Sequence, residues 1–274
     1  MNNKIEIPQA SNPDDINEQF GVLVDIIKIL RKECPWDRNQ TNESIAHLMI
    51  EETYETIEAI NNKDDKEFSK ELGDLLLHVI MHSVMAEERN AFGILEVIKK
   101  IQNKLIHRHP HVFGDVEVSG EKDVLKNWEN LKLQEGKESI LEGVPPTLPA
   151  LLRAQRVQFK AAKVGFDWNN KKDVWKKIEE ELQELKIELE NNNHQKAKEE
   201  LGDVLFSIVN ASRFEDVVAE EALQNSNNKF IRRFRYIEEN AAEQGRLLSD
   251  MSLAEMDALW DEAKKTEDRR KIKE

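Results

Sequence analysis

Apolar residues recur along this chain at the three-to-four-residue spacing of one helix face. Three such stripes are Phe20, Leu23, Val24, Ile27 and Leu30; Ile45, Leu48, Met49, Ile57 and Ile60; and Leu72, Leu75, Leu76, Val79 and Ile80. Further helices are predicted over 94–106, 124–133, 148–163, 171–190, 195–213, 215–243 and 252–265. Apolar and polar residues alternate nowhere long enough to indicate a sheet, and only 112–118 is expected to form a short extended piece. The pattern therefore predicts an all-α fold.

Helix-breaking residues gather near the middle of the chain. Gly143, Pro145, Pro146 and Pro149 follow one another between residues 136 and 149, and such a cluster is typical of a linker. A length of 274 residues also favours two domains. We therefore expect an N-terminal module over 14–135, a linker over 136–147, a C-terminal module over 148–265 and a charged tail over 266–274.

One acidic pattern occurs in both halves at a constant offset of 129 residues. Its members are Glu52, Glu55, Glu71 and Asp74 in the first half, and Glu181, Glu184, Glu200 and Asp203 in the second. Polar turns over 61–65 and 191–193 would let each pair of helices fold back antiparallel. Acids three residues apart share a helix face, so each set is expected to converge in the groove of its hairpin. Four converging carboxylates favour a divalent metal that meets a phosphate substrate.

The alternative is that these glutamates belong to solvated helix surfaces, which is the usual place for a good helix former in a chain that is 34% charged. The recurrence of the whole set argues against this alternative. A glycine also stands within each ExxD pair, at Gly73 and Gly202. Glycine inside a helical apolar run indicates close approach of another backbone or of a ligand.

Cations and tryptophans recur in the same order after the acids. Lys104 and Arg108 are one helical turn apart in the first half, as are Lys229 and Arg233 in the second. Trp128 with Lys132 and Trp260 with Lys264 follow in turn. A Lys–Arg pair on one face can hold phosphate, and a tryptophan can stack on a nucleobase. Taken singly, these residues are more typical of a basic surface and of core packing.

Charge and composition narrow the possible functions. A net charge of −14 argues against a nucleic-acid-binding surface, although metals would still allow an anionic small substrate. A single cysteine, Cys34, excludes an intrachain disulfide and fits a reducing compartment. Neither a secretory signal nor a membrane-spanning apolar run is recognisable, so no membrane partner and a cytoplasmic location are expected.

Taken together, these motifs resemble the two-module MazG nucleoside triphosphate pyrophosphohydrolases of the all-α NTP pyrophosphatase superfamily. The resemblance covers residues 14 to 265, and three further segments carry it: 34–37 (CPWD), 108–114 (RHPHVFG) and 164–168 (VGFDW). It implies two tandem modules resembling four-helix bundles and a homodimer. It also implies Mg²⁺, with Mn²⁺ as a substitute, and hydrolysis of ribo- or deoxynucleoside triphosphates to the monophosphate and pyrophosphate. The expected role is nucleotide-pool house-cleaning or stress-linked nucleotide control.

The resemblance also implies roles for individual residues. Metal ligands correspond to Glu181, Glu184, Glu200 and Asp203, and in the first module to Glu52, Glu55, Glu71 and Asp74; nucleotide contacts correspond to Lys177, Lys196, Lys229, Arg233, Trp260 and Lys264. In the first module Leu48 stands in place of Lys177, and Glu67 in place of Lys196. These exchanges weaken the attraction of a triphosphate–metal complex. The C-terminal module is therefore predicted to be the main catalytic one.

The predicted mechanism is metal-assisted hydrolysis of a phosphoanhydride. Glu180 lies one turn before Glu184, and its helical phase makes it the candidate for the group that accepts the proton of the attacking water. Two other functions compete with this one. A carboxylate-bridged di-iron enzyme would place Glu-x-x-His pairs on two helices, and no histidine here has a glutamate three residues before it. A non-catalytic helical protein that binds a partner, nucleotide or metal would explain the acids, but not the recurring cations and tryptophans.

Overall fold

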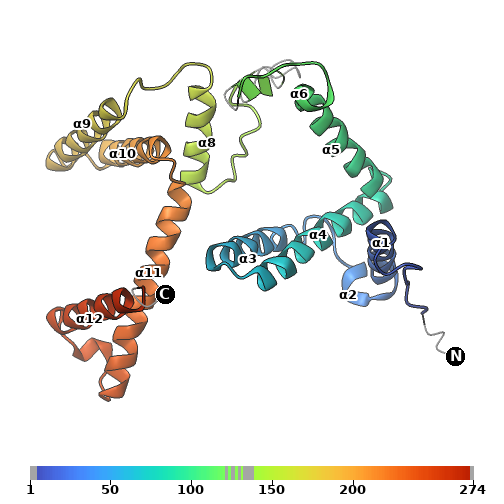
Figure 1. Ribbon diagram of the computed structural model, residues 1–274. Helices are drawn as coiled ribbons and strands as arrows, with labels where there is room; N and C mark the ends of the chain where they lie inside the picture. Colours follow the sequence, from blue (N-terminus) through green and yellow to red (C-terminus); the bar gives the residue numbers. More distant parts are fainter. Residues whose placement is uncertain (1–4, 121–122, 125–126, 129–130, 132–138, 272–274) are drawn as a thin grey trace. The chain divides into compact units, whose positions relative to one another are not determined.

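The computed structural model describes residues 5–120, 123–124, 127–128, 131 and 139–271, and every regular element among them is helical. The all-α prediction is therefore confirmed. The chain divides into two compact units between Val124 and Leu125 (Figure 1), and each unit is described by itself. In the described part of the chain, no helix combines the length and hydrophobicity needed to cross a lipid bilayer.

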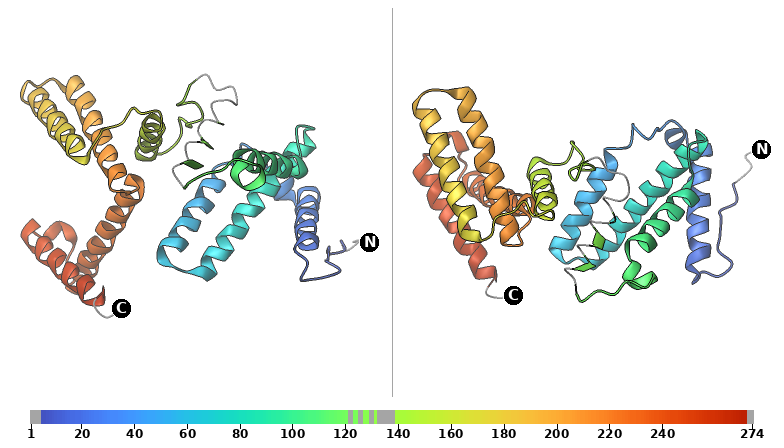
Figure 2. Two further views of the ribbon diagram at one scale, coloured as in Figure 1. Left: turned by 45° about the horizontal axis from the view of Figure 1, so that its top comes forward. Right: turned by 90° about the horizontal axis from the view of Figure 1, so that it is seen from above.

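The first unit is built around a hairpin of two long helices. Its elements are α1 (Ile16–Glu33), α2 (Pro35–Arg38), α3 (Leu48–Asn62), α4 (Asp65–Glu88), α5 (Ile94–Arg108) and α6 (Pro110–Phe113). Helices α3 and α4 run antiparallel, and α1 lies against the C-terminal part of α4 (Figure 2). The prediction of an extended piece over 112–118 is wrong for its first two residues, because Val112 and Phe113 belong to α6. Pro110 occupies the first turn of that helix, where a missing N–H costs nothing.

The second unit repeats the hairpin and adds a longer helical arm. Its elements are α8 (Ala150–Ala162), α9 (Lys171–Glu190), α10 (His194–Phe214), α11 (Ala219–Glu243), the 3-10 turn η1 (Leu248–Asp250) and α12 (Leu253–Lys271). Helix α12 extends beyond the predicted end at residue 265. The helix predicted over 124–133 lies partly outside the described residues, and those of its residues that the structure describes, Trp128 among them, are helical.

Both hairpins close with the same turn chemistry. Lys63 and Asn192 stand at matching positions in the two turns and have positive φ angles of 55° and 53°. The next residue in each case, Asp64 or Asn193, accepts a hydrogen bond from a backbone N–H in the first turn of the second helix. Short polar side chains at such a position stabilise a helix start. The turns stand at the same offset as the acids, so each hairpin brings its two acidic pairs together in the same register.

The two units differ in how they are packed. A cluster of six buried residues connects three parts of the first unit: α1, the loop that precedes α3, and α4. Its members are Ile27, Ile45, Ile80, Met81, Val84 and Met85. The corresponding cluster in the second unit is smaller and consists of Val174, Ile178 and Ala211. Among the described residues, the buried cluster beside the first hairpin is therefore the larger of the two.

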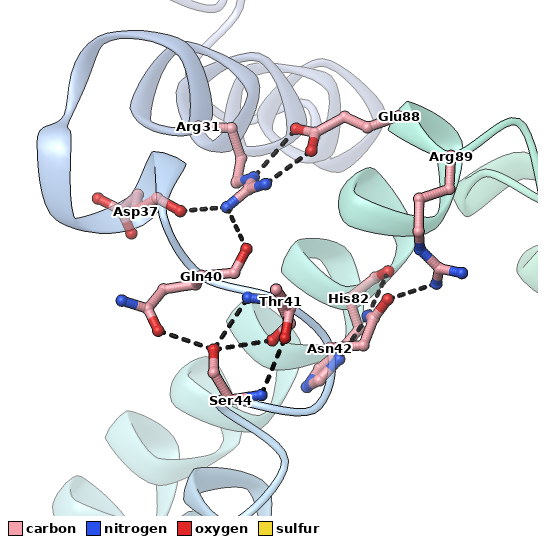
Figure 3. Close-up of polar contacts among 9 residues, drawn as sticks. All are labelled: Arg31, Asp37, Gln40, Thr41, Asn42, Ser44, His82, Glu88 and Arg89. Carbon is pink, nitrogen blue, oxygen red and sulfur yellow. Dashed lines mark hydrogen bonds and ion pairs between the residues drawn. The ribbon is translucent and has the colours of Figure 1, made fainter.

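A polar network fixes the segment 34–37 of the first unit (Figure 3). The buried Arg31 guanidinium donates to the Glu88 carboxylate at 3.0 and 2.6 Å and to the carbonyl oxygens of Asp37 and Gln40. This ion pair lowers the pKa of Glu88 and raises that of Arg31. The network therefore ties the end of α1 to the end of α4.

The loop that precedes α3 is anchored to α4 in the same view. The Asn42 amide lies 2.8 Å from Nδ1 of His82 and donates to the His82 carbonyl oxygen at 3.1 Å, while Arg89 donates to Asn42 Oδ1 (Figure 3). Burial lowers the pKa of His82. Its neutral imidazole therefore serves as a structural contact of the loop.

Each hairpin leaves an apolar stripe on one face of its second helix. The stripe consists of Leu72, Leu76 and Val79 on α4 and of Leu201, Leu205 and Ile208 on α10, at the same offset of 129. These side chains are 39 to 48% exposed. Residues spaced by four and three positions form one continuous helix face. The same partly exposed apolar face is thus present in both modules.

Candidate active site

The second hairpin brings three of the predicted metal ligands together. Glu181 and Glu184 on α9 and Glu200 on α10 each offer a carboxylate oxygen within 4.8 Å of the other two. Glu181 is buried, Glu200 half-buried and Glu184 exposed. Burial, followed by the charges of Glu184 and Glu181, raises the pKa of Glu200. Clustered carboxylates of this kind repel one another and are stabilised by a cation.

The fourth predicted ligand lies at the edge of this group. Asp203 is one turn beyond Glu200 on α10, and its charge contributes to the raised pKa of Glu200. Its carboxylate is not among the three oxygens that approach within 4.8 Å. Asp203 and Glu181 line the same cavity, described below. The hairpin therefore presents three convergent oxygens and a fourth acid beside them.

The first hairpin repeats this geometry. Glu52, Glu55 and Glu71 also place one oxygen each within 4.8 Å of one another. Glu71 is 1% exposed, and its Oε2 atom has no hydrogen-bond partner in the described part of the chain. Burial, then the charge of Asp74, raises the pKa of Glu52. The first module thus retains a carboxylate cluster with a buried oxygen available to an ion.

The two clusters differ in their nearest cations. Lys70 donates to Glu71 and to Glu67, each at 2.7 Å, and the Lys70 contact lowers the pKa of Glu71. In the second module Glu199 stands at the position of Lys70. There the adjacent cation is Lys177 of α9, which donates to Glu180 at 2.5 Å and lies 2.7 Å from Glu181. Both contacts raise the pKa of Lys177 and keep it charged.

The remaining predicted nucleotide contacts are engaged elsewhere in the second unit. Lys196 lies 3.8 Å from Glu188 at the closed end of the hairpin. Arg233 of α11 donates to Glu267 of α12 at 2.9 and 2.8 Å. Figure 1 shows α12 lying along α11 and apart from the α9–α10 hairpin. In the described part of the chain, the contacts of Arg233, Trp260 and Lys264 are with residues of α11 and α12.

Trp260 is half-buried where α11 meets α12. Its ring centroid lies 5.1 Å from that of Phe230, and the Arg233 guanidinium lies 5.5 Å from the Trp260 ring. Lys264 is 3.5 Å from Asp261, and Lys229 is an exposed residue of α11. These contacts give Trp260 a packing role within the chain, and its predicted contact with a nucleotide stays a prediction.

A cavity of about 610 Å³ opens beside the second carboxylate cluster. Lys177, Glu181 and Asp203 form one part of its wall, and Leu141 and residues of α8, α10 and the segment 164–168 form the rest. Sequence reasoning missed the polar residues Gln158, Ser207 and Asn210 in this wall, because nothing in their spacing distinguishes them from other helical residues. The motif 164–168 was the one sequence feature that could have indicated the cavity, because its residues line one side of it.

An ion pair holds segment 164–168 against α10. Arg213 donates to Asp167 Oδ2 at 3.0 Å and also pairs with Oδ1. Gly165 has a φ of 89°, a conformation that favours glycine, and it turns the chain at the end of α8. The first unit fixes its segment 34–37 through Arg31 of α1 instead, so the two modules use different helices for the same purpose.

Two stretches of the chain, residues 40–113 and 170–237, match the family model described as the MazG nucleotide pyrophosphohydrolase domain. The chain belongs to the MazG family. Each matched stretch contains one complete hairpin, α3–α4 or α9–α10, with its carboxylate cluster. The MazG model therefore matches twice, as the repeated acidic pattern predicts.

Curated relatives agree with this MazG membership. The chain is 45% identical over 250 residues to the "Nucleoside triphosphate pyrophosphohydrolase/pyrophosphatase MazG" of Thermotoga maritima, covering 89% of this chain and 95% of that protein. It is 39% identical over 258 residues to the "Nucleoside triphosphate pyrophosphohydrolase" of Escherichia coli K12, covering 91% and 98%. It is 47% identical over 271 residues to "Uncharacterized protein YabN" of Bacillus subtilis, covering 97% of this chain and 55% of that protein.

Proposed function

We propose that this chain hydrolyses nucleoside triphosphates to the nucleoside monophosphate and pyrophosphate, and that its C-terminal module carries the reaction with Mg²⁺. The activity is the one named for the relatives from Thermotoga maritima and Escherichia coli. The observation that carries the proposal is the convergence of Glu181, Glu184 and Glu200 within 4.8 Å, next to Lys177 and a cavity.

The chemistry of the donor set fits a hard divalent cation. All the converging atoms are carboxylate oxygens, which Mg²⁺ prefers and Mn²⁺ also accepts. Glu181, Glu184 and Glu200, with Asp203 beside them, would hold the ion. When bound, Mg²⁺ polarises the phosphate oxygens and offsets the charge of the departing pyrophosphate.

Two residues of α9 act on the substrate directly in this proposal. Lys177 already touches Glu181, so its ammonium group stands where phosphate oxygens meet the carboxylates. Glu180 is exposed and shares the same lysine, and it is the proposed acceptor of the proton that the attacking water loses.

Charge supports the C-terminal module over the N-terminal one. Leu48 and Glu67 replace the two lysines, Lys177 and Lys196, at the corresponding positions. Lys70 moreover occupies an oxygen of Glu71 in the first cluster. A triphosphate–metal complex is anionic, so the N-terminal module attracts it less. We propose that the first cluster binds metal in a structural or regulatory way, for which the unpartnered Oε2 of Glu71 is the supporting observation.

The proposal includes a homodimer in which a second copy covers the apolar stripes of α4 and α10. The stripes are exposed in both modules, and a two-fold assembly would bury such apolar faces between the two copies. A second copy also provides a way for Lys229, Arg233, Trp260 and Lys264 to reach a nucleotide. A mass measurement in solution tests this part: a dimer is expected, and a monomer at micromolar concentration contradicts it.

We place this activity in the cytoplasm, in house-cleaning of the nucleotide pool or in stress-linked control of nucleotides. Product analysis tests the reaction itself. The purified chain is incubated with each nucleoside triphosphate and Mg²⁺, and phosphorus NMR identifies the products. Pyrophosphate and the monophosphate are expected, and EDTA should abolish their release. Orthophosphate and diphosphate as the only products would contradict the proposal.

A further inference from the structure

The linker expected between the modules contains a turn that belongs to the second unit. Residues 139–142 form this linker turn, in which the backbone N–H of Glu142 donates to the carbonyl oxygen of Ser139 at 3.0 Å. Gly143 follows with a φ of 79°, a conformation that favours glycine. The linker turn lies outside the two stretches that match the MazG model, 40–113 and 170–237.

A buried lysine holds the linker turn. Lys160 of α8 is 6% exposed, and its ammonium group donates to the carbonyl oxygens of Ile140 at 3.0 Å and of Glu142 at 3.1 Å. The two bonds connect positions that are 20 and 18 residues apart in the chain. A buried ammonium group is costly unless hydrogen bonds satisfy it, and bonds with a charged donor are the stronger kind. The lysine therefore fixes the linker turn on α8.

The residue between these two carbonyl groups belongs to the cavity of the second unit. Leu141 lines that cavity, together with Ala161 of α8 and the acidic residues Glu181 and Asp203. Lys160 precedes Ala161 in the chain, and it is not among the lining residues of the part that the structure describes. The lysine therefore acts on the cavity through the position of Leu141.

The first module has a buried cation at the same position. Arg31 corresponds to Lys160 at the offset of 129, is 9% exposed and also donates to two backbone carbonyl oxygens. Those oxygens belong to the segment after α1, whereas Lys160 binds the segment before α8. Val217 stands in place of Glu88, so the carboxylate that pairs with Arg31 has no counterpart at that position. The same position thus anchors a different segment in each module.

We propose that Lys160 is a positioning residue of the C-terminal site, which holds the linker turn so that Leu141 closes one side of the cavity beside the carboxylate cluster. The proposal rests on the function proposed above for the C-terminal module. It makes the linker part of the substrate-binding site. Without the ammonium group the turn loses these two bonds to α8, and Leu141 no longer excludes water from that side of the cavity. Substrate binding then weakens, while the carboxylates keep their places.

Steady-state kinetics of Lys160→Met provide the first test. Pyrophosphate release from ATP with Mg²⁺ is measured for the variant and for wild type. KM is expected to rise by about fivefold or more and kcat to stay within about twofold, because this wall contributes to binding and not to the chemical step. Gln155→Met is the matched control, because Gln155 lies on the same helix and bonds to Val217 and Ala219 instead of the linker turn. Its KM should match that of wild type.

Hydrogen exchange tests the contact without any turnover. The backbone amides of residues 139–144 should exchange faster in Lys160→Met than in wild type, and Gln155→Met should leave their exchange unchanged. This measurement separates the inference from the proposed function, since a wild-type chain that releases no pyrophosphate would contradict the function alone. Unchanged exchange over 139–144 in Lys160→Met would overturn the inference whatever the activity.

Leu141→Ser covers the case in which Lys160→Met does not fold. The Leu141 side chain is 41% exposed, so its loss should leave the melting temperature close to that of wild type. KM for ATP should rise as in the lysine variant, and an unchanged KM would overturn the inference. A lower melting temperature of Lys160→Met with an unchanged KM would likewise assign the lysine a structural role alone.

Discussion

Lys70 places its ammonium group 2.7 Å from Glu71, the buried member of the first carboxylate cluster. The contact is absent at the corresponding position of the second module, where Glu199 replaces the lysine. One side chain of the first module thus competes directly with a cation for a candidate ligand. This relationship gives the difference between the modules a structural basis beyond the exchange of Lys177 for Leu48.

Removing this competitor should strengthen metal binding by the first cluster. We expect Lys70→Gln to tighten Mn²⁺ binding by a few-fold and by less than about tenfold, because an exposed lysine contributes modestly. The measurement is calorimetric titration in a Glu200→Gln background, which weakens the second cluster. Lys66→Gln, on the same helix, is the charge-matched control. Unchanged or weaker Mn²⁺ binding by Lys70→Gln would show that the lysine does not compete for Glu71.

The hairpins and their acids were predictable from the sequence because they depend on local spacing. Helical periodicity, polar turns and a constant offset are all visible in the chain, and the structure places Glu181, Glu184 and Glu200 together as expected. The Lys70 contact was not predictable from helix geometry. Residues i and i+1 do not face each other on a helix, and only the length of the lysine side chain allows the bond.

The cavity of the second unit was not predictable for another reason. Gln158 faces Phe206 because α8 packs on α10, 48 residues away in the chain. No local pattern encodes such a contact. The segment 164–168 was recognisable as a motif, but its place beside α10 depends on the Asp167–Arg213 ion pair. Long-range packing therefore determines the features that sequence reasoning missed.

Arg233 is expected to contribute charge stabilisation to the reaction. Arg233→Ala should lower kcat by on the order of 100-fold, the typical loss when one charge-stabilising donor is removed from a transition state. Its ion pair with Glu267 complicates this test, because the variant also breaks a contact between α11 and α12. Glu267→Gln is the control for that loss. A similar fall in kcat for both variants would assign Arg233 a structural role alone.

Substitution of Trp260 distinguishes a packing role of this residue from a role in substrate binding. It packs against Phe230 and Arg233, so Trp260→Ala is expected to lower the melting temperature. If a second copy also brings this ring to the nucleotide, KM should rise for all nucleoside triphosphates by a similar factor, worth roughly 1–3 kcal/mol. Steady-state kinetics and a thermal melt are measured on the same preparation. A lower melting temperature with unchanged KM would remove Trp260 from the substrate site.

The Arg31–Glu88 ion pair predicts how the first unit responds to acid. The pKa of Glu88 is lowered from its ordinary value of 4.5 by Arg31, so the pair stabilises the fold above about pH 4.5 and loses this effect as pH falls through the lowered pKa. Glu88→Gln should therefore be less stable than wild type at pH 6, and the difference should shrink toward pH 3. Thermal melts across this range provide the measurement. A gap that stays constant with pH would contradict the assignment.

The central claim is that the C-terminal cluster carries the reaction, and matched ligand variants test it most directly. Glu181→Gln and Glu52→Gln make the same change at equivalent positions of the two hairpins. Pyrophosphate release from ATP with Mg²⁺ is measured for both and for wild type. Glu181→Gln is expected to lose at least about 100-fold in rate, because even indirect supports of a metal site cost 10- to 100-fold, whereas Glu52→Gln should retain most of the activity. A larger loss for Glu52→Gln would contradict the account.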